Sequence, residues 1–200
     1  MEWLFATFIV ITLIIISFIF LIFMPKPKVF FDSYTNATTL FPQNHDELAK
    51  EILDQGVEKP VIPIYGFGEV KSEDFPKTYQ MLRSMPYVRF AGIINLKPHF
   101  NQDREYGYNV VANHTIRYFY TIKHSATNKS GIWIDGECRF FTEKEWICGD
   151  MSREHSLFNK NKKLYTTVLF IDIDRHESIH DGCSPNSDLS KDEVLKLFAI

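Results

Sequence analysis

The fold class is decided by residues 115–141, which read TIRYFYTIKHSATNKSGIWIDGECRFF. Within this stretch, Thr115–Ile122 is rich in β-branched and aromatic residues, a composition that favours a strand. Ile132–Ile134 and Arg139–Phe141 lie on either side of Asp135-Gly136, a dipeptide typical of a tight hairpin turn. The pattern therefore predicts short strands joined by turns, and a mainly β domain.

Elements on both sides of this stretch support the same class. We predict further strands at Val88–Leu96, Trp146–Cys148 and Tyr165–Ile173. Two helices are predicted before them: one is capped by Asn44, and one runs from Pro76 to Met85 with proline in its first turn. Helices followed by many short strands are typical of a β-sandwich or barrel with the helices packed outside.

The N-terminal run Trp3–Met24 carries no charged residue. It is long enough to cross a bilayer, since about 20 apolar residues in a helix span the hydrocarbon core. It lacks the basic start and the small-residue cleavage site of a signal peptide. We therefore predict one uncleaved transmembrane helix. This run also reconciles a hydrophobic content of 45% with a mean hydropathy of −0.15.

The predicted organisation has four parts: a transmembrane anchor over 1–24, a stalk over 25–43, a β domain over 44–180, and a C-terminal loop with a short helix over 181–200. The net charge of −3 offers no basic excess for nucleic acid. No second apolar run of comparable length is present, which excludes a multi-span transporter.

Two sequence features point to opposite sides of the membrane. Lys26 and Lys28 follow the span and favour a cytoplasmic domain by the positive-inside rule. In contrast, Asn36, Asn113 and Asn128 begin N-x-S/T sequons, which are glycosylated only in the lumen or outside the cell. We expect the domain on the lumenal or exterior side of a single-pass membrane protein.

The chain has three cysteines, which are too few for a disulfide-dense scaffold. Cys138 and Cys148 lie on strands that we expect to be neighbours. They either form a disulfide in an oxidising compartment or remain buried free thiols.

Short motifs occur in a fixed order between Tyr65 and Arg175. They are Ile64-Tyr65-Gly66, Phe75-Pro76-Lys77-Thr78, Ala91–Pro98, Ile116-Arg117-Tyr118, Ile134-Asp135-Gly136, Asp150–His155 and Val168–Arg175. In order and spacing they resemble the aspartyl/asparaginyl β-hydroxylase family, most closely its lipid-A-hydroxylase-like branch, and the block from Arg117 to His155 fits the family pattern without a gap. The resemblance implies a double-stranded β-helix, which is a jelly-roll barrel of the cupin type, and iron(II)- and 2-oxoglutarate-dependent dioxygenase chemistry.

Carried over to this chain, the resemblance implies an incomplete catalytic set. His155 falls at the second iron-ligand position, and Arg117 falls at one cosubstrate position. The first iron ligand falls on Tyr108, the cosubstrate histidine on Phe119, and the cosubstrate arginine near Tyr165 or Thr166. Phenylalanine in place of an imidazole makes the interior more apolar, which suits a filled core better than a polar cosubstrate pocket.

Other residues are candidates to complete an iron site, because the register of residues 99–113 is open. His99, Glu105 and His114 lie near the expected ligand position in the sequence. Imidazole and carboxylate are the ligands that such iron sites use. Arg117 either binds an anion inside the barrel or pairs with an acidic side chain there.

Three functional hypotheses follow. The first is a membrane-anchored, non-catalytic scaffold or binding domain without a cofactor, whose partners are the bilayer and proteins of a membrane complex, and not nucleic acid. The second is an active hydroxylase of a protein or lipid substrate, in which His155 holds iron(II) and Arg117 holds 2-oxoglutarate through charge-assisted hydrogen bonds. The third is a structural or envelope membrane protein of a virus.

Overall fold

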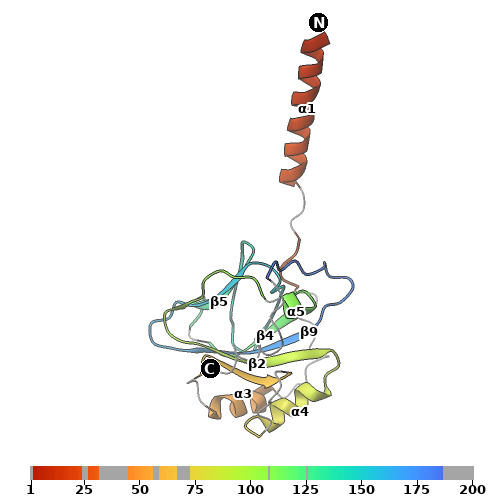
Figure 1. Ribbon diagram of the computed structural model, residues 1–200. Helices are drawn as coiled ribbons and strands as arrows, with labels where there is room; N and C mark the ends of the chain where they lie inside the picture. Colours follow the sequence, from red (N-terminus) through yellow and green to blue (C-terminus); the bar gives the residue numbers. More distant parts are fainter. Residues whose placement is uncertain are drawn as a thin grey trace.

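The computed structural model describes residues 2–23, 27–31, 45–55, 59–66, 73–107, 109–124 and 126–186. Two antiparallel sheets dominate it (Figure 1), one of five strands in the order β1-β2-β9-β4-β7 and one of four in the order β3-β8-β5-β6. The strands are β1 (Val61–Tyr65), β2 (Val88–Leu96), β3 (Phe100–Asn101), β4 (Thr115–Lys123), β5 (Ser130–Ile134), β6 (Glu137–Phe140), β7 (Trp146–Gly149), β8 (His155–Asn159) and β9 (Thr166–Asp174). The helices are α1 (Glu2–Phe23), α3 (His45–Asp54), α4 (Pro76–Ser84) and α5 (Asn109–Ala112). The predicted mainly β class with flanking helices is confirmed.

Alternate residues of the five-stranded sheet face opposite layers, as the two-residue period of a strand requires. On β4, Ile116, Tyr118 and Tyr120 belong to a core that includes side chains of helices α3 and α4. Phe119 belongs to a second core, between the two sheets. Arg117 lies on the same face of β4 as Phe119. The alternation seen in the sequence therefore divides the buried residues into two layers.

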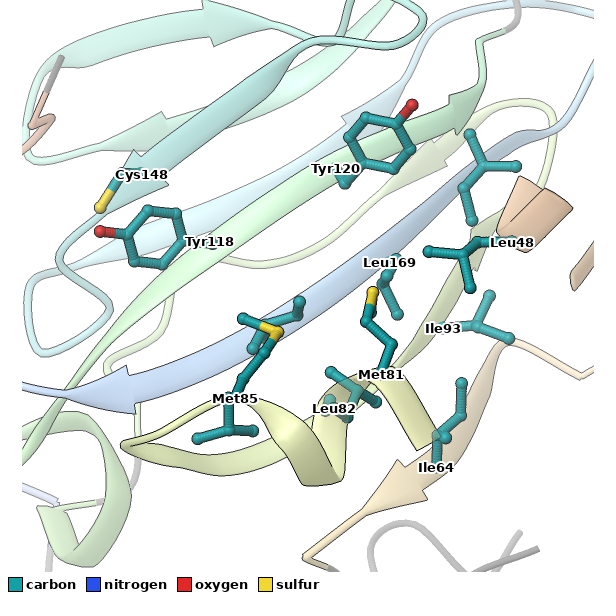
Figure 2. Packing of buried hydrophobic residues seen from close by; sticks show 14 of the residues in the cluster. Leu48, Ile64, Met81, Leu82, Met85, Ile93, Tyr118, Tyr120, Cys148 and Leu169 are labelled. Atoms are coloured by element: carbon teal, nitrogen blue, oxygen red, sulfur yellow. The ribbon is translucent and has the colours of Figure 1, made fainter. Parts of the chain in front are cut away.

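The helix-side core is shown in Figure 2. Leu48 of α3 and Met81 and Leu82 of α4 pack against Ile93 of β2 and Leu169 of β9. Leu82 is fully buried, and removing such a side chain from water contributes about 1.5–3 kcal/mol to stability. This layer attaches the helices to the outer face of the sheet.

Helix α4 begins without a capping side chain of its own, because Phe75 occupies the N-cap position. The Glu51 carboxylate of α3 takes over this role. It accepts the backbone N–H groups of Lys77 and Thr78 at 2.9 and 2.8 Å, and the Thr78 hydroxyl at 2.6 Å. Contact between the two helices thus satisfies the free N–H groups of the first turn, and the negative charge also suits the helix dipole.

The chain enters the β domain earlier than predicted. Val29, Phe30 and Phe31 were assigned to a stalk, yet all three are buried. Phe30 forms an antiparallel bridge with Gly149, next to the end of β7. These three residues of the predicted stalk therefore belong to the buried cores, where removal of apolar side chains from water stabilises the fold.

Some predicted features are absent or lie outside the description. Strands β1, β3 and β8 were not predicted. The capping residue Asn44 of the first predicted helix, the short helix expected after Ser190, and the sequon at Asn36 lie outside the described residues. Asn128 is exposed, whereas the Asn113 side chain accepts the backbone N–H of Ser184 at 2.8 Å.

Helix α1 stands away from the β domain (Figure 1). Large side chains between Ile9 and Ile19 are exposed on it. Within the described residues, no helix combines the length and the apolar character that a membrane crossing needs.

The three cysteines are free thiols. Cys138 lies on β6 of the four-stranded sheet, and Cys148 lies on β7 of the five-stranded sheet. The prediction that the two cysteines occupy neighbouring strands is wrong, because the chain crosses from one sheet to the other between them. The predicted disulfide depended on that neighbourhood and is not formed in the structure.

Candidate functional site

A cavity of about 370 Å³ opens between the two sheets. Most of its wall is apolar and comes from strands of both sheets, with Ile94 and Leu96 from β2, Leu157 from β8 and Phe170 from β9. Its polar side chains include Gln102, Glu105, Arg117, His155 and Asp172. Ligand cavities of proteins commonly have this size and this mixture of apolar wall and few polar groups.

His155 is the most enclosed titratable group on the cavity wall that does not form an ion pair, with 5% of its surface exposed. Its Nδ1 lies 2.9 Å from the carbonyl oxygen of Arg153. Because a carbonyl only accepts, Nδ1 carries the proton and Nε2 is left as an acceptor. Burial lowers the pKa of His155 to about 4, so the imidazole is neutral at pH 7.

Glu105 lies directly opposite His155 across an antiparallel bridge. The Glu105 backbone N–H donates to the His155 carbonyl at 3.0 Å, and the His155 N–H donates to the Glu105 carbonyl at 2.8 Å. Residues opposed in this way project their side chains to the same face. The Gln102 side-chain amide donates to the Glu105 carboxylate. Burial raises the pKa of Glu105, against the effect of this hydrogen bond and of the Arg117 charge.

Arg117 is held by an acidic partner inside the barrel. It faces Asp172 in the register of β4 and β9, and its Nε and Nη2 donate to the two Asp172 oxygens at 2.7 Å each. Asp172 is 1% exposed. The guanidinium carbon also lies 4.4 Å from the centre of the Phe170 ring. Of the two roles predicted for Arg117, the structure shows the pairing with an acid, in a bidentate and largely desolvated geometry.

Of the candidates to complete an iron site, Glu105 is the one that shares the cavity with His155. His99 is exposed in a turn with φ of 59°, and His114 is exposed at the start of β4; neither lines the cavity. Tyr108 lies outside the described residues. Across the described ranges, no group of three His, Cys, Asp or Glu side chains is placed to hold a metal ion.

Phe119 fills the cosubstrate-histidine position with an apolar ring. It is fully buried, and its ring centre lies 5.9 Å from that of Phe141. The position therefore belongs to the core between the sheets, as the sequence predicted. Tyr165, near the expected cosubstrate arginine, is 38% exposed and does not line the cavity.

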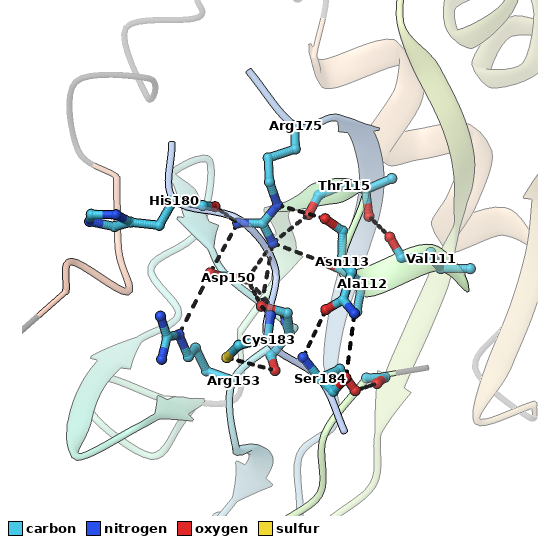
Figure 3. Close-up of polar contacts among 12 residues, drawn as sticks. Val111, Ala112, Asn113, Thr115, Asp150, Arg153, Arg175, His180, Cys183 and Ser184 are labelled. Atoms are coloured by element: carbon cyan, nitrogen blue, oxygen red, sulfur yellow. Dashed lines mark hydrogen bonds and ion pairs between the residues drawn. The ribbon is translucent and has the colours of Figure 1, made fainter. Parts of the chain in front are cut away.

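A buried ion pair next to the cavity was not predicted as a unit (Figure 3). The Arg175 guanidinium donates to the two Asp150 oxygens at 2.6 and 3.1 Å. It also donates to the backbone carbonyls of Ala112, Asn113 and His180. Asp150 and Arg175 begin and end motifs that carry the family resemblance, which was the available signal in the sequence.

This pair joins three parts of the chain. Asp150 follows β7, Arg175 follows β9, and the accepting carbonyls belong to the α5–β4 turn and to the segment after β9. The Ser184 hydroxyl donates to the Gly107 carbonyl, and Asn186 donates to the Tyr106 carbonyl at 2.7 Å. Because Tyr106, Gly107 and Ala112 line the cavity, the network positions one of its walls.

Two facing antiparallel sheets enclose a cavity with an inward histidine, in a jelly-roll-like arrangement. Several solved structures resemble the chain at low sequence identity. They include a viral collagen prolyl hydroxylase of Paramecium Bursaria Chlorella virus-1 (11% identity, 66% of this chain and 89% of that chain, TM-score 0.44). An oxidoreductase of the 2OG-Fe(II) oxygenase family from Burkholderia pseudomallei covers 60% of this chain and 56% of its own (10% identity, TM-score 0.38). The Schizosaccharomyces pombe Cnp3 cupin domain covers 45% and 55% (11% identity, TM-score 0.36).

The sequence profile of the Aspartyl/Asparaginyl beta-hydroxylase family matches residues 61–176, which is more than half of the chain. The chain belongs to this family, and the resemblance seen in the sequence is confirmed. No individual curated protein matches the sequence.

The described side chains do not fit iron(II) and 2-oxoglutarate. They supply two donors on one wall, His155 and Glu105, where a protein iron site of this kind uses three. The cation at the cosubstrate position, Arg117, is already bonded to Asp172 through Nε and Nη2.

Proposed function

We propose that this chain is a non-catalytic member of its family, and that the barrel serves as a binding domain. The observation that carries the proposal is the Arg117–Asp172 ion pair. 2-Oxoglutarate is a dianion, and it is held best by a cation whose charge is not already balanced by an acidic side chain. Here two donors of the guanidinium are bonded to Asp172 at 2.7 Å, and the ion pair as a whole carries no net charge.

The charge of the remaining wall also supports a non-catalytic role. Asp172 balances Arg117, His155 is neutral because its pKa is about 4, and Glu105 is the further acidic group on the wall. When Glu105 is ionised, these four groups sum to one negative charge, which repels an anionic cosubstrate.

A second candidate function is an active hydroxylase with a rearranged site. The Glu105–His155 bridge favours it, since an imidazole Nε2 and a carboxylate face the same cavity. Both groups are suitable ligands for a divalent transition metal.

An anaerobic titration separates the two candidates. The full-length chain, held in a non-ionic amphipol, is titrated with iron(II) and 2-oxoglutarate while visible absorption and thermal unfolding are recorded. A ligand that binds the native state raises its apparent stability. We expect neither the weak visible band of an iron–2-oxoglutarate complex nor a rise in Tm. A band and a Tm rise that both vanish in His155→Asn would establish the active enzyme instead.

We also propose that the run Trp3–Met24 anchors the domain in a membrane. The run has no charge, and large apolar side chains between Ile9 and Ile19 are exposed, so a bilayer would remove them from water. Flotation of the full-length chain with phosphatidylcholine vesicles tests this; we expect co-flotation that Ile14→Lys together with Ile15→Lys abolishes. A chain that stays at the bottom of the gradient would contradict the anchor.

We place the domain on the lumenal or exterior side as part of the same proposal. Asn128 lies exposed with φ of 55°, so a glycan there meets no folded obstacle. In secretory-pathway cells we expect a glycosidase-sensitive mass shift that Asn128→Gln reduces by one glycan. An unshifted chain would place the domain on the cytoplasmic side.

A further inference from the structure

We propose that the cavity between the sheets binds a primary alkylammonium ion, with the ammonium group on Glu105 and His155 and the alkyl body against the apolar wall. This inference rests on the proposed non-catalytic function, because iron and 2-oxoglutarate would occupy the same space. The proposed binding of an alkylammonium ion follows from the hydrogen-bonding groups on the cavity wall that a ligand can reach.

The polar end of the cavity is rich in acceptors. His155 is 5% exposed and uses Nδ1 on the Arg153 carbonyl, which leaves Nε2 as the acceptor nitrogen of the ring. Glu105 presents a carboxylate beside it, and the Gln102 side-chain amide donates to its Oε1. An occupant that brings N–H groups would donate to these two acceptors, which line the same cavity.

Several polar donors on the wall are already used. Arg117 donates to Asp172, the Asn95 amide donates to the Lys59 carbonyl at 2.8 Å, and the Thr115 hydroxyl donates to the Val111 carbonyl at 2.8 Å. An anionic ligand therefore has to compete with Asp172 for the Arg117 guanidinium. A cationic donor, in contrast, can donate hydrogen bonds to both the His155 Nε2 and the Glu105 carboxylate.

The bridge between Glu105 and His155 sets the two acceptors side by side. Its two backbone hydrogen bonds, of 3.0 and 2.8 Å, fix the residues directly opposite each other, and such pairs bring their Cβ atoms to about 5 Å apart. An ammonium group has three N–H bonds and can donate to both side chains at once.

The rest of the cavity suits an alkyl body rather than a hydrated metal ion. Val61, Ile94, Leu96 and Leu157 line it, and a volume of about 370 Å³ leaves room well beyond a single ion. Two side-chain donors would leave most coordination positions of a metal to water, next to this apolar wall.

The experiment measures binding to the full-length chain in a non-ionic amphipol, by titration calorimetry and thermal shift. The probes are hexylamine, hexan-1-ol and hexanoate, which share one alkyl body and differ in the head. Nα-acetyl-lysine N-methylamide distinguishes a protein lysine from a free amine as the natural source. 2-Oxoglutarate and Mn²⁺ are titrated in parallel.

We expect hexylamine to bind at least about tenfold more tightly than hexanol or hexanoate, as one charge-assisted hydrogen bond provides. Glu105→Gln and His155→Asn should each weaken hexylamine about tenfold. His155→Asn keeps a donor for the Arg153 carbonyl and removes Nε2. Glu137→Gln, which removes one charge from exposed β6, is the matched control and should leave the affinity unchanged.

Hexanoate or 2-oxoglutarate binding as tightly as hexylamine would overturn the inference, as would Mn²⁺ displacing the amine or equal losses in Glu105→Gln and Glu137→Gln. If no probe binds, the inference fails while the non-catalytic function stands. If iron(II) and 2-oxoglutarate form the complex described above, the proposed function itself fails. The two failures are therefore distinguishable.

Discussion

Lowering the pH should destabilise the β domain through His155. The folded state holds this imidazole neutral with a pKa of about 4, whereas an unfolded chain leaves it near 6.5. Between these values the unfolded state binds more protons than the folded state, so the free energy of unfolding falls as the pH falls. From pH 7 to pH 5 the loss from this one group is about 2 kcal/mol.

Groups facing His155 modify this behaviour without changing its sign. Arg117 acts with burial to lower the pKa, and Asp150 and the Arg153 carbonyl act against it. The pKa of Glu105 is raised in the folded state, so its protonation adds stability as the pH falls. The parent chain and the His155→Asn variant share the same carboxylates. The difference between their free energies of unfolding at each pH therefore reports mainly the His155 contribution.

The assay is urea unfolding of the full-length chain at pH 7, 6 and 5, followed by tryptophan fluorescence. His155→Asn removes the titrating ring and keeps a donor for the Arg153 carbonyl, so its stability should fall about 2 kcal/mol less than that of the parent between pH 7 and 5. His180→Gln replaces an exposed histidine and should follow the parent. Equal pH dependence in the parent and His155→Asn would refute the reasoning.

Three further outcomes follow from buried contacts. Asp172→Asn leaves Arg117 without its counter-charge and should lower the free energy of unfolding by about 3 kcal/mol; a loss below about 1 kcal/mol in urea unfolding would contradict the role of the pair. Asp150→Asn should likewise lower the free energy of unfolding by about 3 kcal/mol, and it should speed hydrogen exchange of the α5–β4 turn. Unchanged exchange in that turn would count against the network of Figure 3. Glu51→Gln weakens the cap of α4 and should lower Tm in calorimetry by the equivalent of about 1 kcal/mol, and an unaltered Tm would argue against that capping role.

Local features of the chain were predicted well where side chains alone decide them. Val88–Leu96 was predicted as a strand and is β2 with the same limits, because its apolar residues are buried on both faces of the sheet. The helix predicted from Pro76 ends one residue earlier than expected, at Ser84. Strand β8 was not predicted, since its five residues include polar His155, Ser156 and Asn159, yet all five are buried. Burial of polar residues depends on partners from other strands.

The sequence by itself determined the class of the domain, the family and the apolar residue Phe119 on β4. These follow from the two-residue period of strands and from motifs in a fixed order. Only the tertiary structure decided that Arg117 pairs with Asp172, 55 residues away, and that Glu105 faces His155 across a bridge. It also moved Cys138 and Cys148 to different sheets and drew Val29–Phe31 into the core. The physical reason is that strand register and sheet order are set by long-range pairing, which brings together residues that local patterns cannot connect.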